Sequence, residues 1–227
     1  MQYRYQPYNV DASQVTFSGK QAIKVSQTVA YQTAFLAGDP NHVNQGNSYL
    51  EFPFKMFYEG TVDLDLALKR NSYAYSLDIG GGKTFNVGAF GGLLFHKFAS
   101  NQYEAVYLRA ANGAANSVQY ISPPNYIFSN IASRYSATVG TTIAESTWVH
   151  LKIAVYNGLL SVYVGTSTVP VLNNVPLLGP YKKNGKIGLF VDSGTDAYFA
   201  NVVVTKYQPI EEQKKAASKQ KASKQKG

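Results

Sequence analysis

The sequence predicts an all-β protein in which two antiparallel sheets pack face to face as a jelly-roll sandwich. Apolar and polar residues alternate in many short segments, turn residues separate these segments, and no convincing helix longer than about two turns precedes the C-terminal tail. In segment 60–68, Val62, Leu64, Leu66 and Leu68 share one face of an extended chain, which is the period of a strand buried on one side. Many short strands with frequent turns are typical of sandwiches rather than of parallel α/β sheets.

The expected strands follow one another along most of the chain. The first two, 15–17 and 22–25, flank a turn at 18–20. Asn157 and Gly158 separate two later strands, and both residues tolerate the positive φ that a tight hairpin requires. The remaining expected strands are 49–52, 60–68, 73–79, 93–98, 103–109, 117–122, 149–156, 159–164, 186–192 and 197–205.

Two irregular segments interrupt this series. From Pro123 to about Gly140 the chain is too polar and too broken for a strand, so we expect a long loop that either serves a function or is a plain surface excursion. The run 80–84, Gly-Gly-Gly-Lys-Thr, lacks the first glycine and the following helix of a phosphate-binding loop. We therefore expect a glycine-rich hairpin turn there.

Composition and charge limit the classes of function. The chain has 227 residues, a formal net charge of +8 and no cysteine, which excludes disulfides, thiol catalysis and cysteine-bound metals. Residues 211–227 carry six lysines and two glutamates and so supply +4 of this charge. We expect one folded domain at 1–209 and a Lys-rich disordered tail at 210–227, which is either a solvated or non-native extension or an attachment to anionic surfaces. The body shows no run of Lys and Arg, so no specific nucleic-acid partner is expected.

Two segments carry a resemblance to a known superfamily. Residues 103–113, followed by 117–122, form the first. In the second, Trp148–Ile153 resembles a W-x-x-I/V-K-I/V strand, Gly185–Leu189 a G-x-I-G-L strand, and Ala197–Val204 an A-x-F-x-N-V/I/F-x-V closing strand. Over about residues 50–205 the chain resembles bacterial concanavalin A-like domains of the lectin/glucanase superfamily, related to laminin-G and 3-keto-disaccharide-hydrolase-type modules. The resemblance implies the concanavalin A-like jelly-roll fold, but this superfamily holds lectins, glycosidases, lyases and adhesion modules.

One group of residues combines aromatic rings with planar hydrogen-bonding groups. Such a mixture suits a sugar, because the apolar ring faces stack and the hydroxyls take planar hydrogen bonds. The alternative is that these are ordinary strand and turn residues. The candidate ligand-binding residues are Tyr107, Arg109, Asn112, Gln119, Tyr120 and Tyr126.

The carboxylates give only a weak signal for catalysis. Glycoside hydrolysis needs two carboxyl groups about 5–10 Å apart, and the E-x-D-x-E strand motif of jelly-roll glucanases is absent. Asp63 and Asp65 share a strand face and lie about 7 Å apart. They are either a catalytic pair of carboxyl groups or part of an ordinary exposed strand face. Glu104 shares its face with Val106 and Leu108, so it is either a catalytic or sugar-orienting carboxylate or a buried group paired with Arg or Lys from a neighbouring strand.

No cofactor is expected. His42, His96 and His150 lack the spacing of a zinc site. A calcium ion at the rim is frequent in the superfamily, but Ala200 stands where relatives often carry aspartate, which makes such a site doubtful. We interpret Trp148 as core or sheet-rim packing.

The leading functional hypothesis is non-catalytic carbohydrate binding on the concave sheet, with an oligo- or polysaccharide partner. The alternatives are a glycoside hydrolase or a lyase with a tyrosine acid or base, and a purely structural or adhesive module with an exposed apolar patch. The resemblance favours a periplasmic or secreted protein, although the sequence shows no signal peptide and no apolar run of about 18 residues. Catalysis, sugar identity, oligomeric state and compartment stay open.

Overall fold

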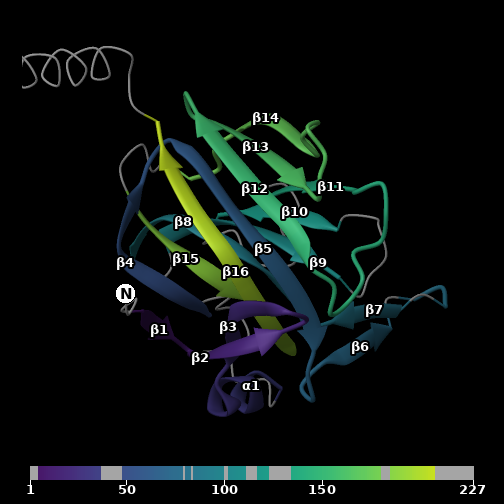
Figure 1. Ribbon diagram of the computed structural model, residues 1–227. Coiled ribbons are helices and arrows are strands. Elements are labelled where there is room, and N and C mark those ends of the chain that lie inside the picture. The colour runs from purple at the N-terminus through teal and green to yellow at the C-terminus, as the bar shows by residue number, and fades with distance from the viewer. Residues whose placement is uncertain are drawn as a thin grey trace, which may run out of the picture.

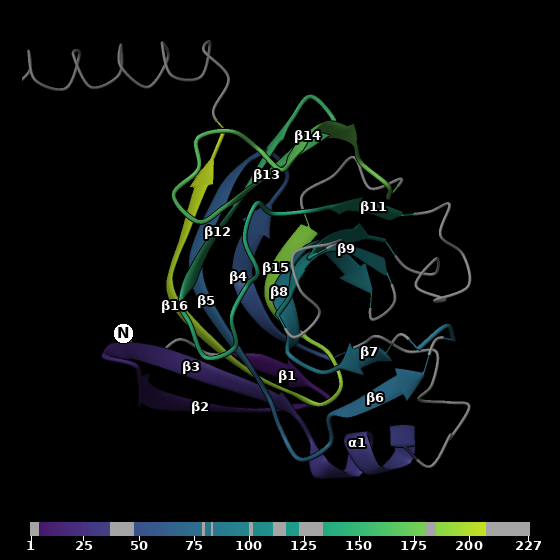
Figure 2. The same cartoon turned by 90° about the vertical axis from the view of Figure 1, so that its right-hand side faces the viewer.

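A computed structural model describes residues 5–36, 48–78, 80–82, 84–99, 102–110, 117–122, 134–179 and 185–207. Two seven-stranded antiparallel sheets pack face to face (Figures 1 and 2). Sheet A has the order β1 (Gln6–Tyr8), β4 (Tyr49–Phe57), β15 (Gly185–Val191), β8 (Phe90–Ala99), β9 (Gln102–Arg109), β10 (Val118–Ile121), β11 (Arg134–Ala137). Sheet B has the order β14 (Leu172–Pro176), β13 (Leu159–Val164), β12 (Val149–Tyr156), β5 (Gly60–Arg70), β16 (Thr195–Lys206), β3 (Lys20–Gln27), β2 (Val10–Phe17). The predicted two-sheet jelly-roll sandwich is confirmed.

Alternation along the strands places the core between the two sheets. Val62 and Leu64 of β5 are fully buried, and they lie opposite Ile153 and Leu151 of β12 in the strand register. Each buried side chain of this size contributes roughly 1.5–3 kcal/mol relative to an exposed one. The period of two predicted for segment 60–68 therefore identifies the core face correctly.

The predicted turns are also present. Asn157 and Gly158 join β12 to β13 with φ of 51° and 72°. Gly80, Gly81 and Gly82 have φ of 83°, 63° and 71°, and they lie between β6 (Tyr75–Asp78) and β7 (Thr84–Val87) in a separate two-stranded hairpin. The glycines of this run thus form a hairpin turn, as predicted.

Five described elements are not in the sequence prediction, namely β1, β7, β11, β14 and α1. β11 lies inside the stretch 123–140 that we expect to be a loop, because hydrogen bonding to the edge of β10 orders it as a strand. The helix α1 (Val29–Leu36) is not predicted. Its N-cap is Thr28, whose hydroxyl accepts a hydrogen bond from the backbone N–H of Tyr31 at 3.2 Å.

The central strands of sheet A are buried on both faces. Its inner face joins the core, and its outer face carries a second buried cluster. At Gly92 a Cβ would lie 2.1 Å from the carbonyl oxygen of Val106, so only glycine permits the close approach of β8 and β9 there. The members of the outer cluster are Tyr49, Phe90, Leu94, Tyr103, Ala105, Tyr107, Ile121 and Phe190.

One side chain of α1 bonds to the end of the sandwich. The amide oxygen of Gln32 accepts hydrogen bonds from the backbone N–H of Gly194 at 3.3 Å and from the amide of Asn71 at 3.4 Å. The helix therefore lies at the same end as the β6–β7 hairpin, as Figure 2 shows. In the described parts of the chain, we find no helix with both the length and the apolar character that a bilayer crossing requires.

Candidate functional site

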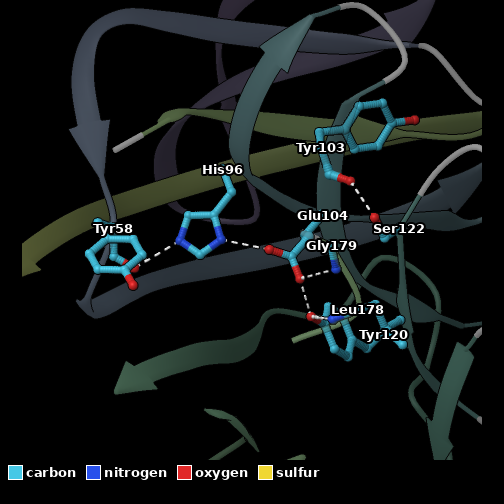
Figure 3. A network of polar contacts seen from close by, with 8 residues as sticks. All are labelled: Tyr58, His96, Tyr103, Glu104, Tyr120, Ser122, Leu178 and Gly179. Carbon is cyan, nitrogen blue, oxygen red and sulfur yellow. Dashed lines mark hydrogen bonds and ion pairs between the residues drawn. The ribbon is translucent and has the colours of Figure 1, made fainter. Parts of the chain in front are cut away.

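Glu104 is at the centre of a buried polar cluster between the sheets (Figure 3). Its Oε2 lies 2.6 Å from Nδ1 of His96, and the Tyr120 hydroxyl donates to its Oε1. All three side chains are fully buried. Glu104 points inward because it shares its register face with Val106, as the alternation predicts.

A β-bulge brings His96 to this cluster. The β8–β9 register shifts after Phe95, and His96 has a φ of 49°. Such a bulge re-aims one side chain, so His96 follows Phe95 on the inner side. Its Nε2 lies 2.8 Å from the carbonyl oxygen of Tyr58. A carbonyl only accepts, so Nε2 donates there, and a second proton lies between Nδ1 and Glu104.

The remaining polar atoms of the cluster are satisfied by the chain before β15. The backbone N–H of Leu178 donates to the Tyr120 hydroxyl at 2.8 Å, and that of Gly179 donates to Glu104 Oε1 at 3.3 Å. Burial, reinforced by the nearby Glu104 carboxylate, raises the pKa of Tyr120 far above its ordinary value, so its hydroxyl stays protonated. Glu104 is paired, as one reading of the sequence expects, but its partners are His96 and Tyr120 rather than Arg or Lys.

The candidate ligand-binding residues divide between the two faces of sheet A. Tyr107 and Gln119 are opposite each other in the register and share the outer face, where 5% and 1% of their surfaces are exposed. Arg109 lies on the same face with its guanidinium 5.3 Å from the Phe90 ring centre. Tyr120 points to the opposite side, into the core, and this placement leaves no ring face for a ligand. Asn112 and Tyr126 lie outside the described residues.

A charged group completes the outer face of sheet A. Glu51, 2% exposed, forms ion pairs with Lys97 and Lys186, each at 2.6 Å. Burial alone would raise the pKa of Glu51, but hydrogen bonds from Lys186 and Lys97 outweigh it and hold the pKa below the ordinary value. Lys97 also lies 5.2 Å from the Tyr49 ring centre. This face combines rings and charges, and the Glu51 carboxylate on it is occupied by Lys97 and Lys186.

Asp63 and Asp65 lie on the outer face of sheet B and are more accessible. His150 lies beside both, with Nδ1 at 3.2 Å from Asp65 and Nε2 at 3.5 Å from Asp63. Lys20 and Asn201 reach Asp65 at 2.6 and 2.8 Å. Burial raises the pKa of Asp65, but the hydrogen bonds from Lys20, Asn201 and His150 outweigh this and hold it below its ordinary value. The predicted shared face is confirmed, and the Asp65 carboxylate is held ionised.

Trp148 packs at the rim of the same face, as the sequence interpretation proposes. It contacts the ring of Phe17 edge-on at 5.9 Å, and Phe17 stacks on Tyr198 at 3.8 Å. The Lys20 ammonium lies 5.1 Å from the Trp148 ring centre. These rings cover a small cluster formed by Ala22, Ala67 and Ala200.

A cavity of about 420 Å³ opens at the edge of the sandwich, and we call it the edge groove. The rings of Tyr5 and Phe52 form one side, with centroids 6.0 Å apart and an interplanar angle of 62°. Three amide side chains of sheet B also line the groove; the amide nitrogen of Gln21 donates to Thr16 and that of Asn201 donates to Asp65. The described lining consists of Tyr5, Gln14, Gln21, Ala22, Ile23, Phe52, Phe199, Ala200, Asn201, Val202 and Val204.

The edge groove exists because β2 carries polar residues on its inward face. Gln14 pairs with Ile23 of β3 in the register, and Ile23 packs against the core, so Gln14 also points inward. It is nevertheless exposed. The groove is completed by the bulge of β16 between Ala200 and Val203, where Asn201 has a φ of 52°.

Sequence reasoning misses the edge groove. The signal is present in β2, where Val15 and Phe17 alternate with Gln14 and Thr16, so that the apolar residues face outward. Among the described residues, no group of three or more His, Asp and Glu side chains is arranged to hold a metal ion.

Comparisons with known proteins give matches in structure only. No family model matches the chain, and no curated protein matches it in sequence. The carbohydrate-binding module CBM66 from Bacillus subtilis superposes with a TM-score of 0.52 at 15% identity, covering 87% of this chain and 92% of that one. A Bacillus licheniformis β-glucanase gives 0.47 at 9% identity (89% and 92% covered), and a human galectin-16 variant gives 0.43 at 15% (71% and 96%). The likeness to the CBM66 module shows the fold alone, a jelly roll of the concanavalin A-like type as the sequence predicts.

Proposed function

We propose that this concanavalin A-like sandwich is a non-catalytic carbohydrate-binding module whose ligand occupies the edge groove. The observation that carries the proposal is the pairing of two aromatic rings, Tyr5 and Phe52, with the amides of Gln14, Gln21 and Asn201 around one accessible cavity.

The chemistry of this lining fits a sugar. A pyranose or furanose ring has an apolar face, which packs against aromatic and aliphatic side chains, and hydroxyls at its rim, which exchange hydrogen bonds with planar amides. The cavity volume of about 420 Å³ lies within the range of roughly 300–1,000 Å³ that small-molecule sites occupy. Carbohydrate binding by the CBM66 module on the same fold adds support.

The titratable groups favour binding over catalysis. A general acid for glycoside hydrolysis needs a raised pKa. The pKa of Asp65 is instead held below its ordinary value by the hydrogen bonds that its carboxylate accepts. Glu104 is sealed between the sheets. A lyase would need a tyrosine that releases its proton, but burial raises the pKa of Tyr49, Tyr103 and Tyr120.

The test is calorimetric titration of the full chain with a panel of oligo- and polysaccharides, repeated with Phe52→Ala. Loss of the Phe52 ring should weaken binding about tenfold, which corresponds to about 1.4 kcal/mol. Gln14→Ala should weaken it less, by removing one amide. Phe98→Ala is the matched control, because Phe98 is an exposed ring on β8 that is not among the described groove residues.

Two further arms decide between alternatives. Arg109→Ala tests the outer face of sheet A. Weaker sugar binding by Arg109→Ala, together with unchanged sugar binding by Phe52→Ala, would place the site at the candidate residues of that face. Analysis of the titrated polysaccharides for new reducing ends or unsaturated products tests catalysis. Products formed by the wild-type chain would overturn the non-catalytic proposal, and absence of binding to every sugar would overturn the proposal as a whole.

A further inference from the structure

The four edges of the two large sheets are not protected to the same degree. An edge strand exposes unpaired backbone N–H and C=O groups, and proteins shield such edges with short strands, proline, bulges or basic residues. In sheet A, β1 is three residues long and contains Pro7, and β11 is four residues long and contains Arg134. At one edge of sheet B, β14 ends at Pro176 and pairs with β13 through a register shift.

The edge formed by β2 has none of these protections. It is eight residues long, without proline, glycine, lysine or arginine, and it pairs with β3 in one unbroken register from Val10 to Phe17. No described strand pairs with its other side. The side chains of Asp11, Ala12, Ser13 and Gln14 are exposed, so within the part of the chain that the structure describes this edge is open to another strand.

The register identifies which backbone groups point outward. The N–H of Thr28 donates to the carbonyl of Asn9 at 3.0 Å, and hydrogen-bonded pairs alternate along an antiparallel ladder. Odd-numbered residues of β2 therefore bond to β3, and Ala12, Gln14 and Thr16 direct their N–H and C=O groups away from the sheet.

We propose that β2 pairs antiparallel with β2 of a second copy of this chain. A two-fold axis perpendicular to sheet B keeps inner and outer faces matched when Gln14 lies opposite Gln14 of the second copy. Ala12 then lies opposite Thr16, and Ser13 opposite Val15. About six backbone hydrogen bonds form across the axis in this register.

Charge and composition favour a second copy as the occupant. Asp11 is the one charged residue of β2, and in this register it faces Phe17, so no like charges are opposed, which would destabilise the pair. The contact also places two Gln14 side chains together on the inward face. The partner copy would then border the edge groove; this consequence alone rests on the proposed function.

Sedimentation velocity of the full chain over a range from micromolar to millimolar concentration tests the proposal. We expect a dimer that forms with rising concentration. Ala12→Pro removes an outward N–H without removing a bond to β3, and Ala12→Lys places a charge at the edge. Each should weaken dimerisation at least about tenfold. The matched control is Asn173→Lys on β14, the opposite edge of the same sheet, which should dimerise like the wild-type chain.

The outcomes separate cleanly. A wild-type chain that stays monomeric throughout the range would overturn the proposal, as would equal dimerisation of Ala12→Lys and Asn173→Lys. If Ala12→Pro does not fold, as judged by circular dichroism, Ala12→Lys decides the question. Sugar binding does not enter this measurement, so failure here leaves the proposed function untouched.

Discussion

Glu104 and Asp65 are strand carboxylates of the two sheets, and they differ in which way the register turns them. Glu104 of β9 points into the core and is fully buried beside His96 and Tyr120. Asp65 of β5 points away from the core, and 16% of its side chain is exposed beside Lys20 and His150. Because side chains alternate between the two faces of a strand, a shift of one residue along the strand decides whether a carboxylate lies in the core or at the surface.

A third carboxylate lies between these extremes. Glu51 is on the outer face of sheet A, like a surface residue, yet it is 2% exposed and held by Lys97 and Lys186. If burial sets the importance of each carboxylate, the free energy of unfolding should fall most for Glu104, less for Glu51 and least for Asp65.

Replacement of Glu104 by alanine is expected to have the largest effect. Glu104→Ala leaves the Tyr120 hydroxyl and His96 Nδ1 buried without their acceptor. Removing one partner of a buried charged pair costs about 3–5 kcal/mol. Urea denaturation followed by circular dichroism measures this loss.

Glu104→Gln is the matched control for that measurement. The glutamine carbonyl can accept from Tyr120, and its amide can donate to Nδ1 of a neutral His96, so the loss should be at most about half as large. Equal losses for the two variants, or no loss in Glu104→Ala, would contradict the assignment of Glu104 to a structural cluster.

The sequence predicts the face of Glu104 but not its partner. Alternation with Val106 is local, so the inward direction follows from the sequence alone. His96 reaches Glu104 through a bulge with positive φ, and the presence of a histidine in a strand sequence does not predict such a bulge. Adjacent residues of a strand face opposite sides of a sheet, so alternation alone separates Tyr120 from its neighbour Gln119.

The edge groove is missed for a different reason. The inward direction of Gln14 can be derived from its alternation with Val15. That this direction leads to a cavity rather than to the core depends on which strands lie at the edges of the sheets, β2 next to β3 in one sheet and β1 next to β4 in the other. Strand order depends on long-range pairing, which alternation does not encode.

Glu51→Gln should have an intermediate effect. The variant removes the negative charge between Lys97 and Lys186, and Lys97 is 11% exposed. A hydrogen bond to a charged group contributes about 1.5–3 kcal/mol, so we expect a loss of about 2 kcal/mol in urea denaturation. Lys186→Met should restore part of this loss in the double variant, because it removes the second unpaired charge. A loss as small as that of Asp65→Asn would contradict the ordering by burial.

Asp65→Asn should have the smallest effect, and it should depend on pH. Because the folded protein holds the pKa of Asp65 below its ordinary value, the folded state binds fewer protons than the unfolded state at mildly acidic pH. The stability contributed by Asp65 is therefore fully present above its unfolded pKa of about 3.9 and is lost as the pH falls through the folded pKa. Wild type and Asp65→Asn should differ by about 1 kcal/mol or less at neutral pH, and their unfolding free energies should converge as the pH falls through the lowered folded pKa. A difference that persists unchanged into this acidic range would show that Asp65 acts through packing and not through its charge.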